Sequence, residues 1–539
     1  MIKNKFTLIF WICFYFAVFS ILINNSFNYL DNDFGWHLKV GEQIVKERAV
    51  PSFDYYDYTL AGRTWVDHEW LANAAVYLIY QKAGYIAVNI LFALVVTGVL
   101  IILNYYISRY FTKKGAFFIA AFGFLGLVAS LPHFGVRVQE LSVINLLLLF
   151  LIMEHYTKSK SLRTLFFIPP LFYFWSTIHG GFLIGIFVMF FWLLVKAVEI
   201  FLNRFSFFSF LDYEKKMSFK NLFNFLIFSF AGVGATLLTP YGLKLYSFLI
   251  DYRSAFYLTR INEWVPFYYL PLNYWQIFFE AFLVSAVILA FYLSLKKKNY
   301  KISIWEMAVS LFFLALAFKS RRHFPLLFIA AFPFLIKFFT AYIDFSFEDY
   351  GKKWIRPFFI IKFFLISGIL CSIVFVLLGV KFTNDPLAFF KKSFPYAAAN
   401  FLKEHPEYND FKIFNNYGWG GYLIWILPER KLFIDGRLPQ LPFAGHTFLE
   451  EYYEFWQAGK AEEKLNQYEI RLVFINNKER YLKINWFEKY FLGYNEEKLN
   501  NIKNNLKNYL NGSERWQTAY QDDLSTIYVK NDENKFFKK

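Results

Sequence analysis

The chain has 539 residues, is 57% hydrophobic and carries 57 Lys and Arg against 41 Asp and Glu, a formal net charge of +16. Its long apolar runs exclude a soluble globular protein, because a hydrocarbon core of about 30 Å is crossed by about 20 apolar residues. Most of the positive excess lies in short loops between these runs, which indicates a membrane protein with a positive inner side and excludes nucleic acid as a partner.

The first apolar run, 6–23, has the composition of a signal peptide but no convincing small-residue cleavage site. We therefore predict a retained span with the N-terminus in the cytoplasm. A long outer loop, 24–70, follows, with a short amphipathic or re-entrant helix at about 69–83. Ten further spans are predicted at 86–108, 115–132, 140–157, 164–179, 182–202, 223–240, 272–294, 302–318, 324–340 and 357–380.

Five loops rich in Lys and Arg fall on one side of these spans, which predicts a multi-pass protein of the cytoplasmic (inner) membrane. They contain Arg109, Lys113 and Lys114; Lys158, Lys160 and Arg163; Lys215, Lys216 and Lys220; Lys296, Lys297 and Lys298; and Lys352, Lys353 and Arg356. The two cysteines, Cys13 and Cys371, lie inside apolar spans, which excludes a disulfide framework and a cysteine-based metal site.

After residue 380 the apolar runs stop and Asn, Glu and Lys become frequent. Short strands are predicted at 411–414, 422–427, 431–435 and 471–475, and helices near 385–404, 447–466 and 495–510. The predicted fold class is a polytopic α-helical membrane protein with about eleven transmembrane helices (1–380) and a C-terminal extracytoplasmic α/β domain (381–539). An odd number of spans places this domain outside, in the periplasm if the organism has two membranes.

Nearly every unusual polar cluster falls on the outer side of the predicted membrane. These clusters are D-N-D-F-G-W-H-L (31–38), V-D-H-E-W-L (66–71), V-R-V-Q-E (136–140), I-H-G-G (178–181), I-N-E-W-V-P (261–266) and S-R-R-H-F-P (320–325). A packing scaffold gives no reason to collect acids, His and Arg at one membrane face. An active site that opens to that face does.

Asp31 and Asp33 follow directly on an apolar span, with Trp36 and His37 beside them. Carboxylates at a membrane edge are costly to desolvate unless they are paired, metal-bound or solvated. They are predicted to act as a catalytic base or as metal ligands, and the alternative is a pair of interfacial loop acids.

The next three clusters each allow a structural alternative. His68 and Glu69 do not have the spacing of a two-histidine metal motif, and Asp67 there could simply cap a helix. Arg137, Gln139 and Glu140 lie at the outer start of a span, where an ionisable group is a functional candidate and Glu140 also suits a helix N-terminus. His179, before two glycines, is either close to a ligand or a satisfied histidine in a helix turn.

Two further outer clusters indicate an anionic substrate. Glu263 lies in an outer loop of about 30 residues that keeps aromatic residues and proline, which is typical of ordered functional loops. Arg321, Arg322 and His323 form a cationic cluster against the positive-inside bias. Because Arg matches phosphate oxygens in pairs, a lipid-linked phosphate or pyrophosphate is the predicted ligand, and ordinary headgroup contact is the alternative.

In the C-terminal domain, N-N-Y-G-W-G-G-Y (415–422) is predicted to form a tight, exposed aromatic platform that includes Tyr417 and Trp419. F-I-D-G-R (433–437) is predicted to be a strand followed by a turn, with Asp435 and Arg437 projecting from its end. The alternative for Asp435 is a turn cap.

These residues resemble the GT-C superfamily of membrane glycosyltransferases. The chain is similar to a group of bacterial members that carry a D-x-D-x-W-H-L loop, an H-E-W-L helix, an E-W-x-P loop and a G-G-Y-L…D-G-R segment, and this similarity covers roughly 25–440. A fainter likeness to the oligosaccharyltransferase catalytic subunit places Asp31 at its first-loop acid and Glu263 at its external-loop glutamate. The central Asp of its W-W-D-Y-G motif is missing from 415–422, and its second-loop acidic pair is reduced to Gln139–Glu140.

The resemblance implies transfer of a sugar from a polyprenyl-phosphate or polyprenyl-pyrophosphate donor, within the lipid bilayer, to a glycan, lipid or protein acceptor at the outer face. It implies Asp31 as the base, Asp33 as its neighbour and Glu263 as a secondary acid in one cavity. Arg321, Arg322, His323 and Arg137 would hold the donor phosphate, with Mg²⁺ or Mn²⁺ on Asp31 and Asp33 as an optional cofactor. The other polar residues of that cavity would be His37, His68, Glu69, Glu140 and His179.

Two other classes of function remain as alternatives. A transporter or flippase of lipid-linked sugars would carry ionisable residues near span centres and inverted repeats; charges near span centres are scarce in this sequence, and it has no convincing repeat. A non-catalytic member would keep the scaffold for assembly or polymer binding, because a fold does not fix a function.

Overall fold

The computed structural model describes residues 2–111, 116–205, 217–251, 256–261, 263–296, 303–342, 369, 373, 376, 378–380, 382–383, 393–478, 482–500 and 504–531. The chain forms two compact units. The helical unit comprises Met1–Tyr29, Ile86–Gly242 and Tyr257–Phe382, and the mixed unit comprises Leu30–Tyr85, Leu243–Phe256 and Thr383–Lys539. Most of the first outer loop therefore folds together with the C-terminal residues, and the predicted domain boundary at 380/381 stays a prediction.

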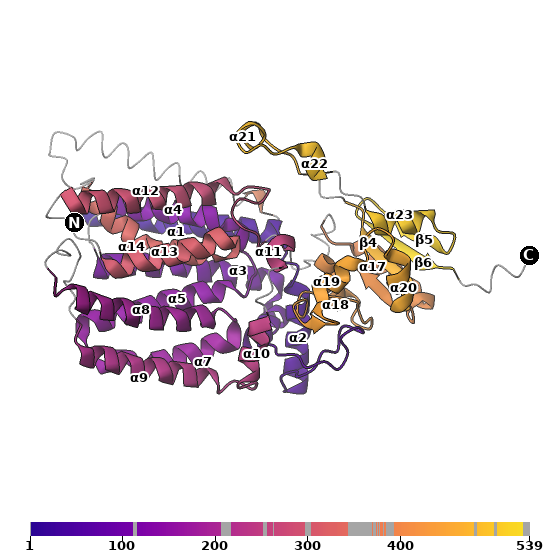
Figure 1. The fold of residues 1–539 in the computed structure, drawn as a ribbon, viewed down its shortest axis with the longest axis horizontal. Coiled ribbons are helices and arrows are strands. Elements are labelled where there is room, and N and C mark those ends of the chain that lie inside the picture. The colour runs from indigo at the N-terminus through magenta and orange to yellow at the C-terminus, as the bar shows by residue number, and fades with distance from the viewer. Residues whose placement is uncertain are drawn as a thin grey trace, which may run out of the picture. The chain divides into compact units, whose positions relative to one another are not determined.

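The helical unit is a bundle in which α12 packs against α4 and α14, and α13 packs against α14 and α8 (Figure 1). Its elements are α1 (Ile2–Asn28), the greater part of α3 (Trp70–Tyr110), α4 (Ala116–Ser130), α5 (Glu140–Ser159), α6 (Leu162–Leu165), α7 (Ile168–Ile178), α8 (Phe182–Leu202), α9 (Phe219–Thr236), α11 (Tyr257–Arg260), α12 (Tyr274–Lys296), α13 (Ile304–Lys319) and α14 (Phe324–Tyr342), with 3₁₀ turns η1 (Leu131–His133) and η4 (Arg321–His323).

The predicted membrane class is confirmed. In the part of the chain that the structure describes, 6 helices are long and apolar enough to cross a membrane: Thr7–Asn28, Trp70–Tyr110, Glu140–Ser159, Phe182–Leu202, Tyr274–Lys296 and Arg321–Ala341. Each predicted span up to 340 falls on a helix, except that 164–179 corresponds to the end of α6 and to α7, and most of the span predicted at 357–380 lies outside the described residues. Within α3, Gly84 is non-helical with φ 75°, so the short helix predicted at about 69–83 is distinct from the span that follows.

The mixed unit combines short helices with a small sheet. Its helices are α2 (Phe34–Glu47), the start of α3, α10 (Lys244–Ile250), α17 (Tyr396–Glu404), α18 (Gly420–Ile426), α19 (Phe448–Glu454), α20 (Ala461–Gln467), α21 (Trp486–Tyr490), α22 (Glu496–Asn500) and α23 (Asn505–Gly512), with 3₁₀ turns η6 (Pro406–Tyr408) and η7 (Tyr417–Trp419). The predicted C-terminal α/β fold is thereby confirmed.

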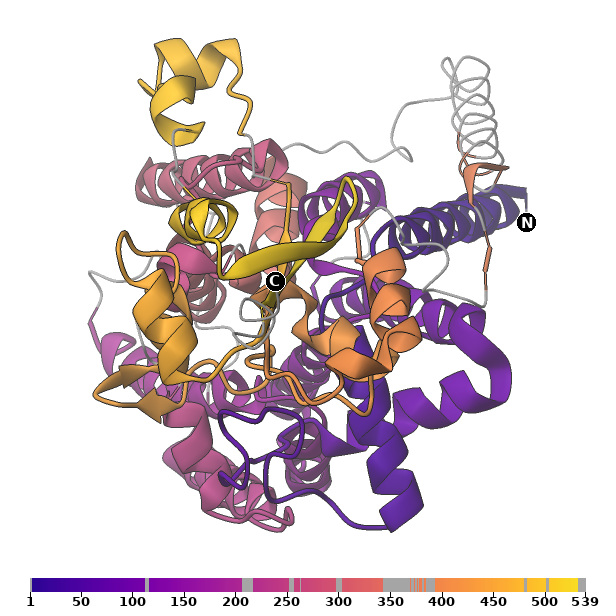
Figure 2. The same ribbon diagram turned by 90° about the vertical axis from the view of Figure 1, so that its right-hand side faces the viewer.

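The sheet has the strand order β1-β4-β6-β5. Its strands are β1 (Ile413–Asn415), β4 (Leu472–Asn476), β5 (Trp516–Gln521) and β6 (Ser525–Lys530), and β2 (Pro442–Phe443) and β3 (His446–Thr447) form a separate hairpin. β1 is parallel to β4, whereas the β4–β6 and β6–β5 pairs are antiparallel. The β5–β6 ribbon is drawn in yellow in Figure 2.

Two of the four predicted strands are wrong. The segment predicted as strand 422–427 is the helix α18, which is almost wholly buried, so its continuous apolar run did not distinguish helix from strand. The segment 431–435 makes one isolated bridge, between Asp57 and Leu432, and no named strand. The strands predicted at 411–414 and 471–475 correspond to β1 and β4, and β5 and β6 were not predicted although both contain β-branched and aromatic residues.

The predicted helices of this unit are partly confirmed. The segment 447–466 contains two helices, α19 and α20, because the chain turns at Gly459 with φ 76°. The segment 495–510 contains α22 and the start of α23. α17 covers the last part of the helix predicted at 385–404, and 384–392 lie outside the described residues.

Backbone hydrogen bonds join the first outer loop to the C-terminal segment. The Tyr58 N–H donates to the Leu432 carbonyl (3.0 Å), and the Leu432 N–H donates to the Tyr56 carbonyl (2.8 Å). The Thr59 hydroxyl donates to the Phe433 carbonyl at 2.6 Å. The apolar run 431–435 is thus paired along its backbone, but with a loop rather than within a sheet.

Glycines allow α2 to lie directly against α18. A Cβ on Gly35 would overlap the carbonyl oxygen of Gly421, and a Cβ on Gly421 would overlap the carbonyl oxygen of Asn32. Because both obstacles are backbone atoms, they cannot move aside as a flexible side chain could.

We expect Gly35→Ala to destabilise the mixed unit by about 1–3 kcal/mol, the usual cost of forcing an extra carbon into a packed site. The measurement is thermal unfolding of the full chain in detergent, followed by tryptophan fluorescence. Gly512→Ala is the matched control, since a Cβ there meets open space. Equal melting temperatures for Gly35→Ala and wild type would show that α2 and α18 are not closely packed.

Candidate functional site

The arginine cluster of the helical unit consists of Arg137, Glu263, Arg321 and Arg322. Arg137 Nη1 donates to Glu263 Oε1 at 2.5 Å, and Arg322 Nη1 lies 3.9 Å from Glu263 Oε2. Arg322 Nη2 also donates to Gln139 Oε1 at 3.2 Å. One carboxylate is thus shared by two guanidinium groups, which leaves this trio with an excess positive charge.

Backbone hydrogen bonds hold the Glu263 loop against the η4 turn. The Arg322 N–H donates to the Glu263 carbonyl (2.9 Å), and the Arg321 N–H donates to the Val265 carbonyl (3.1 Å). Ser320 has extended backbone (φ −156°, ψ 123°), which ends α13 and presents both N–H groups to the loop. The predicted clusters at 136–140, 261–266 and 320–325 are therefore brought together.

Aromatic rings cover the two guanidinium groups that contact Glu263. The Arg322 guanidinium lies 4.7 Å from the centre of the Trp264 ring, and that of Arg137 lies 5.5 Å from the centre of the Tyr29 ring. Burial raises the pKa of the Glu263 carboxyl, but Arg137 and Arg322 lower it by more, so the net pKa is below its ordinary value. Glu263 is therefore a stable anion near neutral pH.

The acid loop of the mixed unit consists of Asp31, Asp33 and Trp36. Asp31 Oδ1 accepts the Asp33 N–H at 2.8 Å, and Asp33 Oδ1 accepts the Trp36 indole N–H at 2.9 Å. Both carboxylates remain partly exposed. A Cβ on Gly436 would overlap Asp33 Oδ1, so the D-G-R turn lies against Asp33 within this unit. The loop is ordered by its own side chains, and Asp31 is partly exposed.

A buried hydrogen-bond chain follows the acid loop. His37 Nδ1 lies 2.6 Å from Asn73 Oδ1, and Asn73 Nδ2 donates to both oxygens of Asp67 at 3.0 and 2.9 Å. Burial raises the pKa of Asp67 to about 6. His68 Nε2 lies 3.5 Å from Glu69 Oε1; burial lowers the pKa of His68, but Glu69 raises it by more. The structure thus brings the motifs at 31–38 and 66–71 together.

The D-G-R segment forms a buried charge cluster around Arg437. Arg437 pairs with Asp435, lies 2.8 Å from Asp54 Oδ1 and lies 3.9 Å from Asp57 Oδ2. All four side chains are at most 1% exposed, so the expectation that Asp435 and Arg437 project from a strand end is wrong. Burial raises the pKa of Asp54 and raises that of Asp57 well above its ordinary value.

The Gly-rich segment is packed rather than exposed. Trp419 is 4% exposed and contacts Phe474, and Tyr422 is 2% exposed. The Tyr417 N–H donates to the Tyr452 hydroxyl at 3.3 Å, and Tyr417 is half-buried. The prediction of an exposed aromatic platform is therefore wrong, because the two glycines of α18 let this helix pack closely against neighbouring backbone.

Two candidates of the helical unit have structural partners. His179 Nδ1 lies 2.7 Å from the Ser142 hydroxyl and accepts the Gly181 N–H at 3.0 Å. Glu140 Oε1 accepts the Gly135 N–H at 2.5 Å in the turn before α5. These contacts support the alternative of a satisfied histidine and a helix-start acid.

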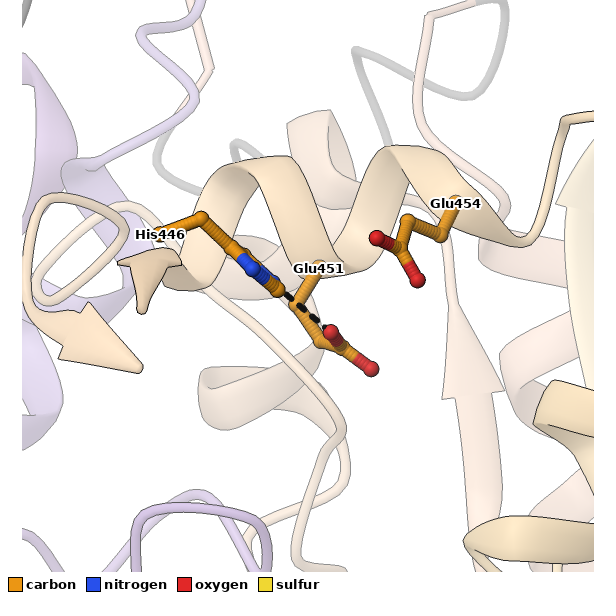
Figure 3. Close-up of side chains that lie close together, drawn as sticks. All are labelled: His446, Glu451 and Glu454. Carbon is orange, nitrogen blue, oxygen red and sulfur yellow. Dashed lines mark hydrogen bonds and ion pairs between the residues drawn. The ribbon is translucent and has the colours of Figure 1, made fainter. Parts of the chain in front are cut away.

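Among the described residues, one set of His and acidic side chains is close enough to share a metal ion: His446, Glu451 and Glu454 (Figure 3). His446 Nε2 lies 2.8 Å from Glu451 Oε2. Lys464 Nζ, however, lies 2.7 Å from Glu451 and 2.6 Å from Glu454, so an ammonium group already pairs with both carboxylates. A metal ion would have to displace Lys464. Asp31 and Asp33 offer the oxygen ligands that Mg²⁺ and Mn²⁺ prefer, and a metal there stays a prediction.

The candidates thus fall into two groups, one in each unit. Arg137, Glu263, Arg321, Arg322 and His323 belong to the helical unit, with Glu140 and His179. The mixed unit holds Asp31, Asp33, His37, His68, Glu69, Tyr417, Trp419, Asp435 and Arg437. Their catalytic and binding roles stay predictions.

Comparison with known proteins gives similar solved structures only. No family model and no curated protein matches the chain. The oligosaccharyltransferase of Archaeoglobus fulgidus in the apo form is similar with 11% identity and a TM-score of 0.49, over 88% of this chain and 69% of that one. Archaeal oligosaccharyltransferase AglB from Archaeoglobus fulgidus, in complex with an inhibitory peptide and a dolichol-phosphate, is similar with 12% identity and a TM-score of 0.46, over 88% and 70%.

Both structures are of oligosaccharyltransferases, the family to which the sequence motifs have the predicted likeness. At TM-scores below 0.5, the similarity carries no argument about what this chain does.

We expect Arg437→Met to destabilise the mixed unit by about 3–5 kcal/mol, because it leaves buried carboxylates without their cation. Unfolding of the full chain in detergent measures this. Arg515→Met is the control, since Arg515 and its partner Glu462 have side chains 61% and 50% exposed, and it should cost under about 1 kcal/mol. Similar losses for both variants would rule out the buried cluster.

We expect Asp67→Asn to become more stable relative to wild type as the pH rises from 4 to 8. The folded-state pKa of Asp67 is raised from 3.8 to about 6. The stability that protonated Asp67 gives to the wild type is therefore fully present below pH 3.8 and is lost as the pH rises through 6. This shift corresponds to about 3 kcal/mol at most. Melting temperatures of both proteins across this range test it, and a pH-independent difference would contradict it.

Proposed function

We propose that this chain is an integral-membrane glycosyltransferase. It moves a sugar from a polyprenyl-phosphate or polyprenyl-pyrophosphate donor to an acceptor at the outer face of the cytoplasmic membrane. The observation that carries the proposal is the arginine cluster, in which Arg137 and Arg322 share the single carboxylate of Glu263. Two guanidinium groups that converge on one carboxylate, one buried and the other partly exposed, match the paired oxygens of a phosphate, and a lipid phosphate is the anion available at a membrane surface.

The proposed transfer step gives one role to the arginine cluster and another to the acid loop. An acceptor hydroxyl or amide attacks the anomeric carbon of the sugar as the bond from that carbon to the phosphate oxygen breaks. The polyprenyl phosphate or pyrophosphate leaves with the electron pair, and Arg322 and Arg137 stabilise its growing negative charge. Asp31 takes the acceptor's proton, which requires an ionised and accessible carboxylate. Mg²⁺ or Mn²⁺, if held by Asp31 and Asp33, would supply further positive charge.

The geometry at Glu263 favours a positioning role over proton transfer. Its carboxylate is bound by Arg137 and approached by Arg322, and its lowered pKa keeps it ionised. Such a group donates no proton near neutral pH. Glu263 would instead fix the two guanidinium groups at the spacing that a phosphate needs.

The alternative is a non-catalytic or transport protein that binds lipid-linked glycans with the same cluster. It predicts binding of the lipid without release of polyprenyl phosphate, so a turnover measurement separates it from the transferase.

We expect Asp31→Asn to reduce sugar transfer by a factor of at least about 100, the contribution of a general base. Purified full-length protein in nanodiscs is incubated with polyprenyl-phosphate sugars, and release of free polyprenyl phosphate is followed. Asp523→Asn is the control, because Asp523 is an exposed acid of the β5–β6 turn in the same unit. Full activity of Asp31→Asn would exclude it as the base, and lipid binding without release by wild type would support the alternative.

A further inference from the structure

A second polar group lies beside the arginine cluster in the helical unit, and it contains Ser130, His133, Gln276 and Glu280. Asn273 Nδ2 donates to the Ala129 carbonyl at 3.3 Å, and Gln276 Nε2 lies 3.1 Å from His133 Nε2. These two contacts place the start of α12 against the end of α4 and the η1 turn.

Helix geometry gives the two side chains of each element a common direction. Gln276 and Glu280 are four residues apart in α12 and share one helix face. Ser130 and His133 are three residues apart across a 3₁₀ turn, where side chains at this spacing eclipse. All four residues are less than 9% exposed.

Three atoms of this group have no hydrogen-bond partner among the described residues: Ser130 Oγ, His133 Nδ1 and Glu280 Oε2. A buried polar atom without a partner costs free energy, and most such atoms in folded proteins are paired. Three of them on two elements that contact each other through Gln276 and His133 therefore indicate a ligand that supplies hydrogen bonds.

The group adjoins the arginine cluster electrostatically. His133 interacts with Glu263, Arg137 and Arg322, and Glu280 interacts with Arg321. A ligand held by the guanidinium groups would thus present its neighbouring atoms to this second polar group.

The chemistry of these four side chains indicates which part of the donor lipid they bind: its phosphate, its prenyl chain or its sugar hydroxyls. A phosphate is disfavoured next to the Glu280 carboxyl, and a prenyl chain would leave all three polar atoms unpaired. Hydroxyl groups fit, because each one donates to a carboxyl oxygen and accepts from an imidazole or amide N–H.

We propose that Ser130, His133, Gln276 and Glu280 form the subsite that binds the hydroxyl groups of the donor's sugar. This inference rests on the proposed function and extends it, since it assigns the part of the donor that the arginine cluster does not bind.

The test uses full-length protein in nanodiscs and compares binding of two lipids by tryptophan fluorescence. One is undecaprenyl phosphate, and the other is undecaprenyl phosphate that carries glucose, N-acetylglucosamine or arabinose. We expect Glu280→Gln to weaken binding of the tightest glycosylated lipid roughly tenfold, because an amide NH2 replaces a carboxyl oxygen and cannot accept the hydrogen bond of a sugar hydroxyl. Its binding of bare undecaprenyl phosphate should stay within about twofold of wild type.

Three further variants separate the subsite from folding and from the phosphate site. Ser130→Ala should show the same selectivity with a smaller loss, and it carries the test if Glu280→Gln fails to fold. Ser229→Ala is the matched control, since this buried serine donates to the Phe225 carbonyl of its own helix and should change neither affinity. Arg322→Ala should weaken binding of both lipids.

The outcomes are distinguishable. Unchanged binding of both lipids by Glu280→Gln and Ser130→Ala would show that the group holds only water, and equal weakening of both lipids would show a structural role. Either result overturns the subsite while the proposed function stands. If wild type binds neither lipid, the proposed function and the subsite both fail.

Discussion

The mixed unit depends on the buried charge cluster around Arg437. Its guanidinium lies among the carboxylates of Asp54, Asp57 and Asp435, between the rings of Tyr56 and Trp65. Burying these charges gives little net stability, but breaking such a cluster is costly, so its main effect is to specify which segments pair. It joins a loop near residue 55 to a turn near residue 435. The close packing of α2 on α18, and with it the placement of the acid loop, follows from this pairing.

The helical unit uses charge in a different way. Its arginines are half-buried or buried, yet the carboxylate of Glu263 is divided between two of them. The Arg437 cluster has the opposite imbalance, with one guanidinium among three carboxylates, and burial raises the pKa of two of these acids, Asp54 and Asp57. A cluster with surplus positive charge is stable only where solvent, aromatic faces or an anion compensates it, and Trp264 and Tyr29 supply the aromatic faces. This difference in charge balance distinguishes a binding site from a packing device.

The sequence predicted structure best where a single physical effect, such as hydrophobic length, determines the fold of a segment. Long apolar runs correctly predicted the long helices of the membrane part, because hydrophobic length largely decides them, whereas α2, α10 and α11 were not predicted. In the C-terminal unit the helix α18 was predicted as a strand, since a short apolar run buried on all sides has no periodicity to distinguish the two. The partners of Arg437 were not predicted, because Asp54 and Asp57 are distant in sequence and only tertiary packing brings them to it. Gln276 and Glu280 were also missed, although a carboxyl four residues after an amide inside an apolar run was a usable signal.

Glu263 and Glu280 show why the surroundings of an acid matter more than its presence in a motif. Glu263 lies in a recognisable motif, yet its oxygens are held by arginines and its carboxylate is a fixed element of the cluster. Glu280 lies in no motif, in an otherwise apolar stretch of α12, with one oxygen unpartnered among the described residues. A membrane helix that keeps a buried carboxyl in this state bears a cost that leucine would remove. Packing does not explain why the helix keeps this carboxyl. Binding of a polar ligand beside the arginines explains it.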